Sequence, residues 1–385
     1  MAAYLTILLV TAGAAAVATP VVRFLAVRFG AIDRPSDRKV HPKPTPTLGG
    51  AAIWVAMLAG LGTASLMPAF RGLFAVSSEP LGVALAGTVI MVLGAVDDLR
   101  DLPVPAKVAG QVLAAGILLL NGVQLVYFWF PGVGVLSLSP DLAVPLTLLW
   151  VLAVVNAVNL IDGLDGLAAG VVAIAAAAFF WYASQAGEPV FGGPDSPSPA
   201  ALLSLVAVGA SVGFLPYNFN PAKIFMGDSG SMLLGVVLAA ATVSGVGRTT
   251  APNDFSDFAA LAIPVAIPLL VLAVPLADVV LAIVRRMRRG RPVTRPDKEH
   301  VHHRLLEIGH SHRQAVLLMY LWSGLLAGAA LLITFVRSRA LALWLIVAVV
   351  VVLAGSALAR PVRNGRRWAR AKTPAESPQE SGGGV

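Results

Sequence analysis

The chain has 385 residues, of which 57% are hydrophobic and only 12% are charged, and its mean hydropathy is +0.81. An ordinary soluble domain carries about 25% charged residues, so this composition excludes that class and indicates an integral membrane protein. The net charge of +8 does not indicate a nucleic-acid partner, because basic residues beside membrane helices contact anionic headgroups. The chain has no cysteine, which excludes disulfides and a thiol nucleophile.

The predicted elements are apolar runs long enough to cross a hydrocarbon core of about 30 Å. We find eleven, at 2–28, 47–67, 80–96, 103–121, 142–160, 164–185, 199–216, 229–247, 259–284, 315–336 and 340–359. The sequence therefore predicts an all-α polytopic membrane protein, a bundle of about eleven transmembrane helices. Residues 1–360 form its single transmembrane domain, and residues 361–385 form a basic and then low-complexity tail.

The distribution of basic residues predicts the orientation of the bundle in the membrane. An odd number of spans puts the two termini on opposite sides. With one choice of sides, the outer loops hold only Arg71, Arg248, Arg337 and Arg339 of the 28 Lys and Arg residues. The positive-inside rule selects that choice. We therefore expect the N-terminus outside and the tail in the cytoplasm.

Polar residues gather in the predicted inner loops, and the outer loops hold nothing comparable. Carboxylates at a membrane boundary cost free energy unless they are hydrated, paired or bound to a cation. Five inner loops with polar clusters therefore indicate one active site that faces the cytoplasm.

The first acidic cluster is "VDDLRD", after the third run. On a helix Asp97, Asp98 and Asp101 crowd one sector and repel one another, so the cluster requires a cation or a proton. The alternative is a helix end whose acids pair with Arg100 and nearby arginines. Lys107 is either another structural partner or a phosphate contact.

The second cluster is "NAVNLIDGLDGLAAG", residues 156–170, between two apolar runs. It places Asn156, Asn159, Asp162 and Asp165 three residues apart, so their side chains lie on neighbouring positions of a helix. The interleaved glycines permit a turn or the close approach of a ligand. In the alternative reading, the two acids only cap the following helix.

The third cluster is "NPAKIFMGDSGS". Asp228 and Ser229 stand directly before an apolar run, where either would cap the helix, and capping does not exclude metal ligation. Phe225 either packs in the bundle or stacks on a base, and the sequence alone favours packing.

The last cluster holds five of the six histidines, between His300 and His312. His300, His302 and His303 cannot share one helical face, which suggests a loop that wraps an anion. His310 and His312 are interpreted as solvated side chains. A zinc site is disfavoured, because the chain has neither cysteine nor an HExxH motif.

Hard carboxylate and amide oxygens favour Mg²⁺, with Mn²⁺ as a substitute. Acids, a divalent cation, lysines and a histidine loop together indicate phosphoryl-group transfer, and the chain has no P-loop. An ion-coupled secondary transporter is the rival, but transporters place their sites near the midplane, often between repeats. A scaffold or lipid-binding protein would leave the carboxylates unexplained.

The motifs "DDLRD", "PAKVAGQ", "NAVNLIDGLDGL", "NPAKIFMGDSGS" and "HVHHRL" follow one another in this order. As a set, from about Lys39 to His303, they resemble those of the polyprenyl-phosphate N-acetylhexosamine-1-phosphate transferases. Members transfer a sugar 1-phosphate from a UDP-sugar to a polyprenyl phosphate at the cytoplasmic face of the cell membrane, with Mg²⁺, and release UMP. The resemblance implies the same reaction, donor, acceptor and location here.

The resemblance also implies a role for individual residues. Asn159 and Asp228 match the positions that hold Mg²⁺. Asp97 and Asp98 match the catalytic acidic pair, of which one deprotonates or orients the attacking lipid phosphate.

Other matches surround the substrates. Asp162, Asp165 and Phe225 match positions around the nucleotide, with the Phe ring against uracil. The matches to positions near the phosphates or the sugar are Lys43, Lys107, His300, His302 and His303.

The histidine motif bears on the choice of sugar. The family's phospho-MurNAc-pentapeptide translocases have three adjacent histidines followed by an acid and ten spans, whereas this chain reads His-Val-His-His-Arg-Leu and has eleven predicted spans. These departures favour the branch that transfers GlcNAc-1-phosphate, in the first lipid-linked step of cell-wall or surface-polysaccharide assembly. The peptidoglycan enzyme remains the alternative. The prenyl chain, undecaprenyl or decaprenyl, and the oligomeric state, a homodimer included, stay open.

Overall fold

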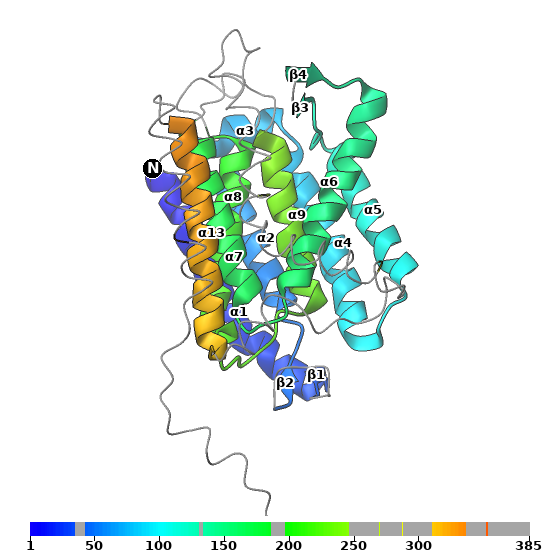
Figure 1. Cartoon of the computed structure of the whole chain (residues 1–385), viewed down its shortest axis with the longest axis vertical. Helices are drawn as coiled ribbons and strands as arrows, with labels where there is room; N and C mark the ends of the chain where they lie inside the picture. Colours follow the sequence, from blue (N-terminus) through cyan, green and yellow to red (C-terminus); the bar gives the residue numbers. More distant parts are fainter. Residues whose placement is uncertain are drawn as a thin grey trace, which may run out of the picture.

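A computed structural model of the chain describes residues 1–34, 43–130, 134–185, 197–245 and 310–335, together with Leu269, Met287 and Val352. The described part is mostly helical (Figure 1). Its helices are α1 (Ala2–Arg28), α2 (Gly50–Leu66), the 3-10 turn η1 (Pro68–Phe70), α3 (Arg71–Val76), α4 (Glu79–Arg100), α5 (Val104–Leu120), α6 (Pro140–Ile161), α7 (Leu167–Gln185), α8 (Pro199–Asn218), α9 (Gly227–Gly245) and α13 (His312–Phe335).

The predicted class, an all-α polytopic membrane protein, is confirmed. Within the described ranges, seven helices are long and apolar enough to cross a membrane, or eight if α2 and its continuation after a bend of 86° count as one span. Nine of the eleven predicted runs coincide with helices. The runs 259–284 and 340–359 and the tail 361–385 lie outside the described residues, so the count of eleven stays a prediction.

Prolines mark where several helices begin and where one bends. α4, α5, α6 and α8 each carry proline in their first two positions, where the missing N–H would have no partner in the helix. Ser198 caps α8 by accepting a hydrogen bond from the Ala201 N–H at 3.1 Å. α2 stops before Pro68, where the chain turns by 86° into η1 and α3.

Two short antiparallel pairs of strands lie at opposite ends of the bundle (Figure 1). β1 (Ile32–Asp33) pairs with β2 (Thr45–Pro46) between α1 and α2. β3 (Tyr127–Phe130) pairs with β4 (Gly134–Ser137) between α5 and α6, a hairpin that the apolar runs did not predict.

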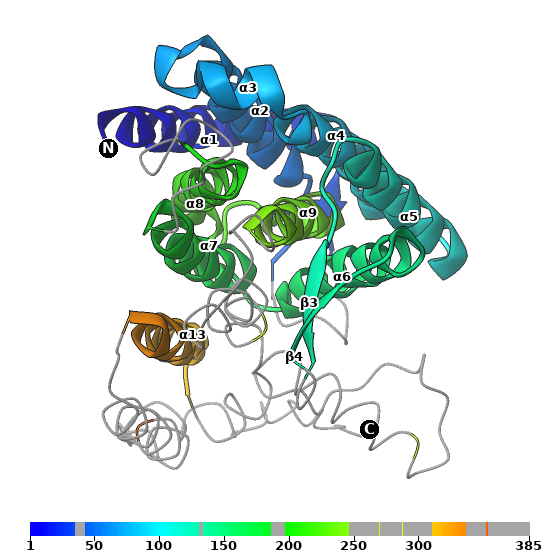
Figure 2. The same ribbon diagram turned by 90° about the horizontal axis from the view of Figure 1, so that it is seen from above.

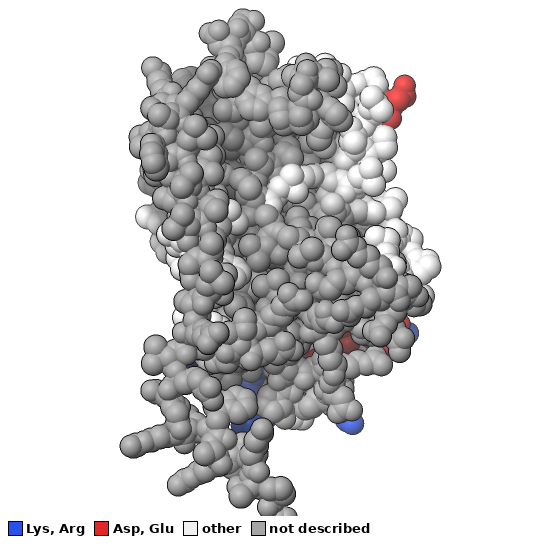
Figure 3. Space-filling view, in the orientation of Figure 1, with Lys and Arg blue, Asp and Glu red and all other residues white. Residues whose placement is uncertain are grey.

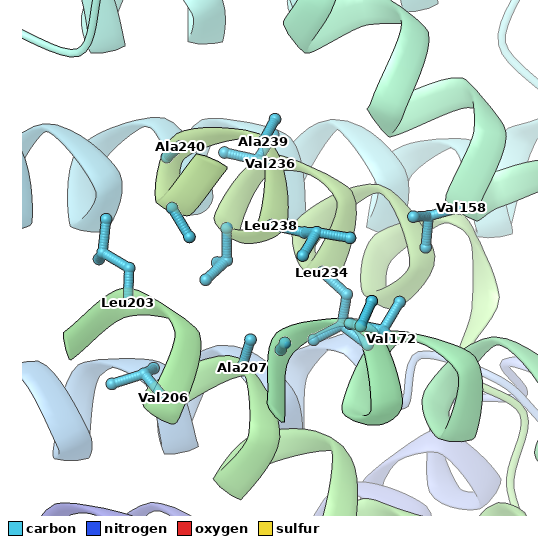
Figure 4. Packing of buried hydrophobic residues seen from close by; sticks show 14 of the residues in the cluster. Val158, Val172, Leu203, Val206, Ala207, Leu234, Val236, Leu238, Ala239 and Ala240 are labelled. Atoms are coloured by element: carbon cyan, nitrogen blue, oxygen red, sulfur yellow. The ribbon is translucent and has the colours of Figure 1, made fainter. Parts of the chain in front are cut away.

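Helix α9 lies at the centre of the bundle (Figure 2). It packs against α2, α4, α6, α7 and α8. Leu234 and Leu238 of α9 are buried in the apolar cluster that also contains Val172 of α7 and Val206 of α8 (Figure 4). Because the surrounding helices fix α9 on several sides, its first turn has a defined position at one end of the bundle.

The polar loops meet at that same end. The turns between α1 and α2, α4 and α5, α6 and α7, and α8 and α9 all lie at the lower end of Figure 1, whereas the N-terminus lies at the upper end. In Figure 3 the charged side chains visible beyond the grey atoms also gather at the lower end, apart from one acidic patch near the start of α6. The predicted one-sidedness of the polar clusters is therefore present in the described fold.

Candidate active site

Four helices bring four of the predicted site residues together at the lower end of the bundle. Asp97 lies near the end of α4, Lys107 in the first turn of α5, Asn159 in the last turn of α6 and Asp228 in the first turn of α9. The Lys107 ammonium forms ion pairs with Asp97 and with Oδ2 of Asp228, the latter at 3.2 Å. Nδ2 of Asn159 donates a hydrogen bond to Oδ1 of Asp228 at 2.9 Å. Residues far apart in sequence thus form one cluster.

Asp97 is buried, and both of its oxygens have partners. Oδ1 accepts a hydrogen bond from the Leu102 N–H at 2.7 Å, and Oδ2 pairs with Lys107. α4 ends because Asp101 takes a left-handed conformation with φ +48°, which turns the chain towards α5. The cation beside Asp97 is therefore Lys107, rather than Arg100 as in the alternative reading.

Asp98 caps a helix that begins 129 positions later in the chain, at Gly227. Its Oδ1 accepts the Asp228 N–H at 2.8 Å, and its Oδ2 accepts the Ser229 N–H at 3.3 Å and the Ser229 hydroxyl at 2.8 Å. The expectation that Asp228 or Ser229 caps this helix is wrong, because α9 already begins at Gly227 and both lie in its first turn. The Asp98 carboxylate of α4 accepts hydrogen bonds from those N–H groups. Its negative charge also interacts favourably with the positive end of the α9 dipole.

Glycines let α2 and α4 touch the first turn of α9. A Cβ on Gly94 of α4 would lie 2.4 Å from the Ser229 N and Cα atoms. A Cβ on Gly50 of α2 would lie 2.3 Å from the Gly230 N atom. Because these contacts are between backbones, the position of Asp228 is set by three helices together.

The loop between α6 and α7 adds two more carboxyl groups, those of Asp162 and Asp165. Burial, together with the charges of Asp228, Asp98 and Asp165, raises the pKa of Asp162 from 3.8 to about 8. Burial and these neighbouring acids therefore favour the neutral form of Asp162. The acidic groups that act on Asp162 come from three segments, whereas the sequence grouped Asp97, Asp98 and Asp101 of one helix.

Asp165 joins two loops. Its Oδ2 accepts hydrogen bonds from Nδ2 of Asn220 at 2.8 Å and from the Ala222 N–H at 3.0 Å, so it ties the α6–α7 loop to the α8–α9 loop. In the alternative reading Asp165 caps α7. Instead, the Asp165 N–H donates to Nε2 of His312 at 3.0 Å and the Gly166 N–H donates to Oδ1 of Asn218 at 3.1 Å.

Phe225 lies beside the segment that follows Lys43. The Phe225 N–H donates to the Pro46 carbonyl at 2.8 Å, and its carbonyl accepts from the Gly49 N–H at 3.0 Å. Lys43 is exposed just before β2, and its carbonyl accepts from the Thr45 hydroxyl at 3.1 Å. The fold thus brings the Lys43 segment to the α8–α9 loop, and the Phe225 side chain is half-buried there.

Among the predicted histidines, His300, His302 and His303 lie outside the described residues. His312, interpreted from sequence as solvated, instead contacts the Asp165 backbone. Asn156, the first polar residue of the second motif, pairs with Gln111 of α5, whose Oε1 accepts from Asn156 Nδ2 at 2.8 Å. The position of Gln111, four residues after Lys107 on the same helical face, is the sequence signal that could have indicated this pair.

The donor atoms at the cluster are chemically suited to a hard divalent cation. The Asp228 carboxylate and the Asn159 amide carry oxygen donors of the kind that Mg²⁺ prefers. Within the described ranges, no group of three or more His, Asp or Glu side chains forms a ready-made metal site.

Comparison with known proteins places the chain among enzymes. Residues 80–246 match the model of glycosyl transferase family 4. A decaprenyl-phosphate N-acetylglucosaminephosphotransferase of Mycolicibacterium smegmatis is 43% identical over 328 residues, which cover 83% of this chain and 79% of the relative.

More distant relatives have similar names. A probable undecaprenyl-phosphate N-acetylglucosaminyl 1-phosphate transferase of Bacillus subtilis is 33% identical over 303 residues, covering 79% of this chain and 77% of the relative. An undecaprenyl-phosphate alpha-N-acetylglucosaminyl 1-phosphate transferase of Escherichia coli is 27% identical over 318 residues, covering 80% and 78%. The matched family region contains Asp97, Lys107, Asn159 and Asp228. With that cluster inside the matched region and relatives similar over most of its length, the chain belongs to glycosyl transferase family 4.

Proposed function

We propose that this protein transfers GlcNAc-1-phosphate from UDP-GlcNAc to a polyprenyl phosphate, which yields polyprenyl-diphosphate-GlcNAc and UMP. The observation that carries the proposal is the meeting of Asp97, Lys107, Asn159 and Asp228 at one end of the bundle. The names of the relatives, which pair N-acetylglucosamine with decaprenyl or undecaprenyl phosphate, support the sugar and the acceptor. The reaction would be the first lipid-linked step of cell-wall or surface-polysaccharide assembly.

In the direct form of the reaction, an oxygen of the lipid phosphate forms a bond to the phosphorus that carries the sugar. The bond from that phosphorus to the bridging oxygen breaks, and UMP leaves with its electron pair. Two anions must approach each other, so the catalytic task is positioning and the stabilisation of negative charge. Lys107, between Asp97 and Asp228, supplies positive charge where the phosphates would meet. Asp97 orients the acceptor phosphate or accepts its proton.

A Mg²⁺ ion, replaceable by Mn²⁺, is part of this proposal. Asn159 and Asp228 would hold it. Burial, followed by the charges of Asp228, Asp98 and Asp165, raises the pKa of the nearby Asp162 to about 8, and the acidic charge among these causes supports a cation at this place. When bound, the ion offsets the repulsion between the two substrates and stabilises charge on the leaving UMP. Since the four clustered side chains come from one chain, the proposal requires no second copy.

The remaining assignments concern the substrates. Asp162, Asp165 and Phe225 would surround the nucleotide of the UDP-sugar, near the loops that Asp165 joins. The residues proposed at the phosphates and the sugar are Lys43, Lys107, His300, His302 and His303. Asp98 is proposed to act beside Asp97 by capping α9, which positions Asp228.

The proposed location is the cytoplasmic membrane, with eleven spans, the N-terminus outside and the active site and tail facing the cytoplasm. The distribution of Lys and Arg supports this orientation. The gathering of the α1–α2, α4–α5, α6–α7 and α8–α9 turns at the end opposite the N-terminus also supports it (Figure 1).

The test is release of radiolabelled UMP from UDP-GlcNAc by the purified protein in detergent, with polyprenyl phosphate and Mg²⁺. We expect release that requires both the lipid and the ion. Asp228→Asn and Asn159→Ala should abolish it, whereas Asp141→Asn, at the opposite end of α6, should not. If the first two variants fold normally and keep the wild-type rate, the assigned site is wrong.

The same assay separates the alternatives. UMP release from UDP-MurNAc-pentapeptide but not from UDP-GlcNAc would support the same transfer reaction with a different donor sugar. If no UDP-sugar gives UMP release and the protein takes up solute in proteoliposomes, the protein is a transporter and not this enzyme. A phosphorylated protein trapped without acceptor would show a covalent route through an aspartate rather than direct attack.

A further inference from the structure

The start of α13 contacts the α6–α7 loop and the α8–α9 loop, where the nucleotide is proposed to bind. Nε2 of His312 accepts the Asp165 N–H at 3.0 Å. Nε of Arg313 donates to the Asn220 carbonyl at 2.9 Å. The Tyr320 hydroxyl, two turns further on, donates to the Gly166 carbonyl. One helix therefore contacts the α6–α7 loop at two points and the α8–α9 loop at a third.

The contact at Tyr320 is close as well as polar. A Cβ on Gly170 of α7 would lie 2.1 Å from the Tyr320 Cζ atom, so the ring lies directly on the α7 backbone. Gly166 has a φ of +83°, a backbone conformation that residues with side chains rarely adopt. Its carbonyl accepts the hydrogen bond from the Tyr320 hydroxyl. The Tyr320 contact therefore fixes the end of the loop, and His312 fixes its middle.

The His312 contact has a specific chemical requirement. A backbone N–H donates to Nε2, so the imidazole acts as an acceptor there, which requires a neutral ring with its proton on Nδ1. A glutamine can place an acceptor oxygen at a similar reach, whereas a leucine of similar bulk cannot accept a hydrogen bond. The two replacements therefore separate the hydrogen bond from the volume of the side chain.

We propose that His312 is a positioning residue for the UDP-sugar: it holds the Asp165 backbone so that Asp162, Asp165 and the α8–α9 loop keep the geometry that binds the donor. This proposal rests on the proposed function. His312 contacts the Asp165 backbone, whereas Lys107 pairs with Asp97 and Asp228, so His312 acts on the site through Asp165. Its loss should therefore weaken donor binding and leave acceptor binding unchanged.

The experiment compares His312→Leu, His312→Gln and the control His310→Leu, two residues earlier and outside the helix. Kinetics of UMP release give KM for UDP-GlcNAc and for polyprenyl phosphate, and calorimetry gives Kd for UDP. For His312→Leu we expect about a tenfold rise in KM for the donor and in Kd for UDP, since one part-buried N–H loses its acceptor. KM for the lipid should not change. Glutamine should restore most of the loss, and His310→Leu should behave as wild type.

Tyr320→Phe is the second variant, because it keeps the ring on Gly170 and removes only the hydroxyl. Like His312→Leu, it should raise Kd for UDP, but only a few-fold. Equal donor and lipid effects, no rescue by glutamine, or a His312→Leu protein that binds UDP as tightly as wild type would each overturn the proposal. Failure of the wild-type protein to use any UDP-sugar would instead overturn the proposed function.

Discussion

A methyl group on Gly94 should push α4 and α9 apart at the point where Asp98 caps α9. The added Cβ would lie 2.4 Å from backbone atoms of Ser229, whereas ordinary van der Waals contact begins at 3.4 Å. Because the partner is helix backbone, it cannot rotate away, and the two helices must separate by about 1 Å. A displacement of about 1 Å at a reacting group can cost about 100-fold in rate. Asp228 is adjacent to Ser229, so we expect kcat of Gly94→Ala to fall about 100-fold.

The assay is lipid-dependent UMP release, with thermal unfolding in detergent as a check on folding. Overpacking of this kind costs about 1–3 kcal/mol of stability, so Gly94→Ala should unfold at a lower temperature but still fold. Gly116→Ala in α5 is the matched control, because its Cβ would meet no atom within 4 Å. The control should keep its rate and gain up to about 1 kcal/mol from helix propensity. If Gly94→Ala folds and transfers as fast as the control, the contact between α4 and α9 does not position Asp228.

Three further predictions concern the cluster. Lys107→Met removes the cation between Asp97 and Asp228 and should lower the rate of UMP release about 100-fold, whereas Lys107→Arg should keep part of it; equal rates for the two variants would contradict this role. Asp98→Ala removes the cap of α9 and should cost about 1–2 kcal/mol in thermal unfolding, while Asp98→Asn, which keeps an acceptor, should cost less. The pKa of Asp162 is raised from 3.8 to about 8, so without divalent cations its contribution to stability should fall as the pH rises between these values, because the unfolded chain releases the proton first. Asp162→Asn should flatten that pH dependence, and an unchanged slope in the melting temperature would show that another group causes it.

The limits of the helices and the motifs depend on consecutive residues, so they could be predicted from the sequence. The limits of α1 and α6 follow the apolar runs closely, because the length and hydropathy of a span are properties of consecutive residues. The motifs that hold Asp97, Asn159 and Asp228 could be recognised for a similar reason. Their spacing within each motif and their order along the chain are visible without a structure.

The parts that could not be predicted are contacts between distant segments. Asp98 appeared as one member of an acidic pair, and only the packing of α4 against α9 shows that its oxygens meet the α9 N–H groups. His312 carried no periodic signal, and its partner, a backbone N–H, has no residue type that a sequence could reveal. Sequence reasoning therefore selected residues that the fold brings together, Asp97, Lys107, Asn159 and Asp228, and missed those that hold them in place.

The central place of α9 has a consequence for how the protein is made. Among the described candidate spans, α9 has the lowest hydropathy and is the most buried inside the bundle. Its transfer into lipid alone is therefore the least favourable. Its neighbours α2, α4, α6, α7 and α8 all precede it in the chain and leave the ribosome first. We therefore expect α9 to enter the bundle during synthesis between helices that have already been inserted. Asp228 arrives after both Asp97 and Lys107, so the two carboxylates come together only once the ammonium that pairs with both is in place.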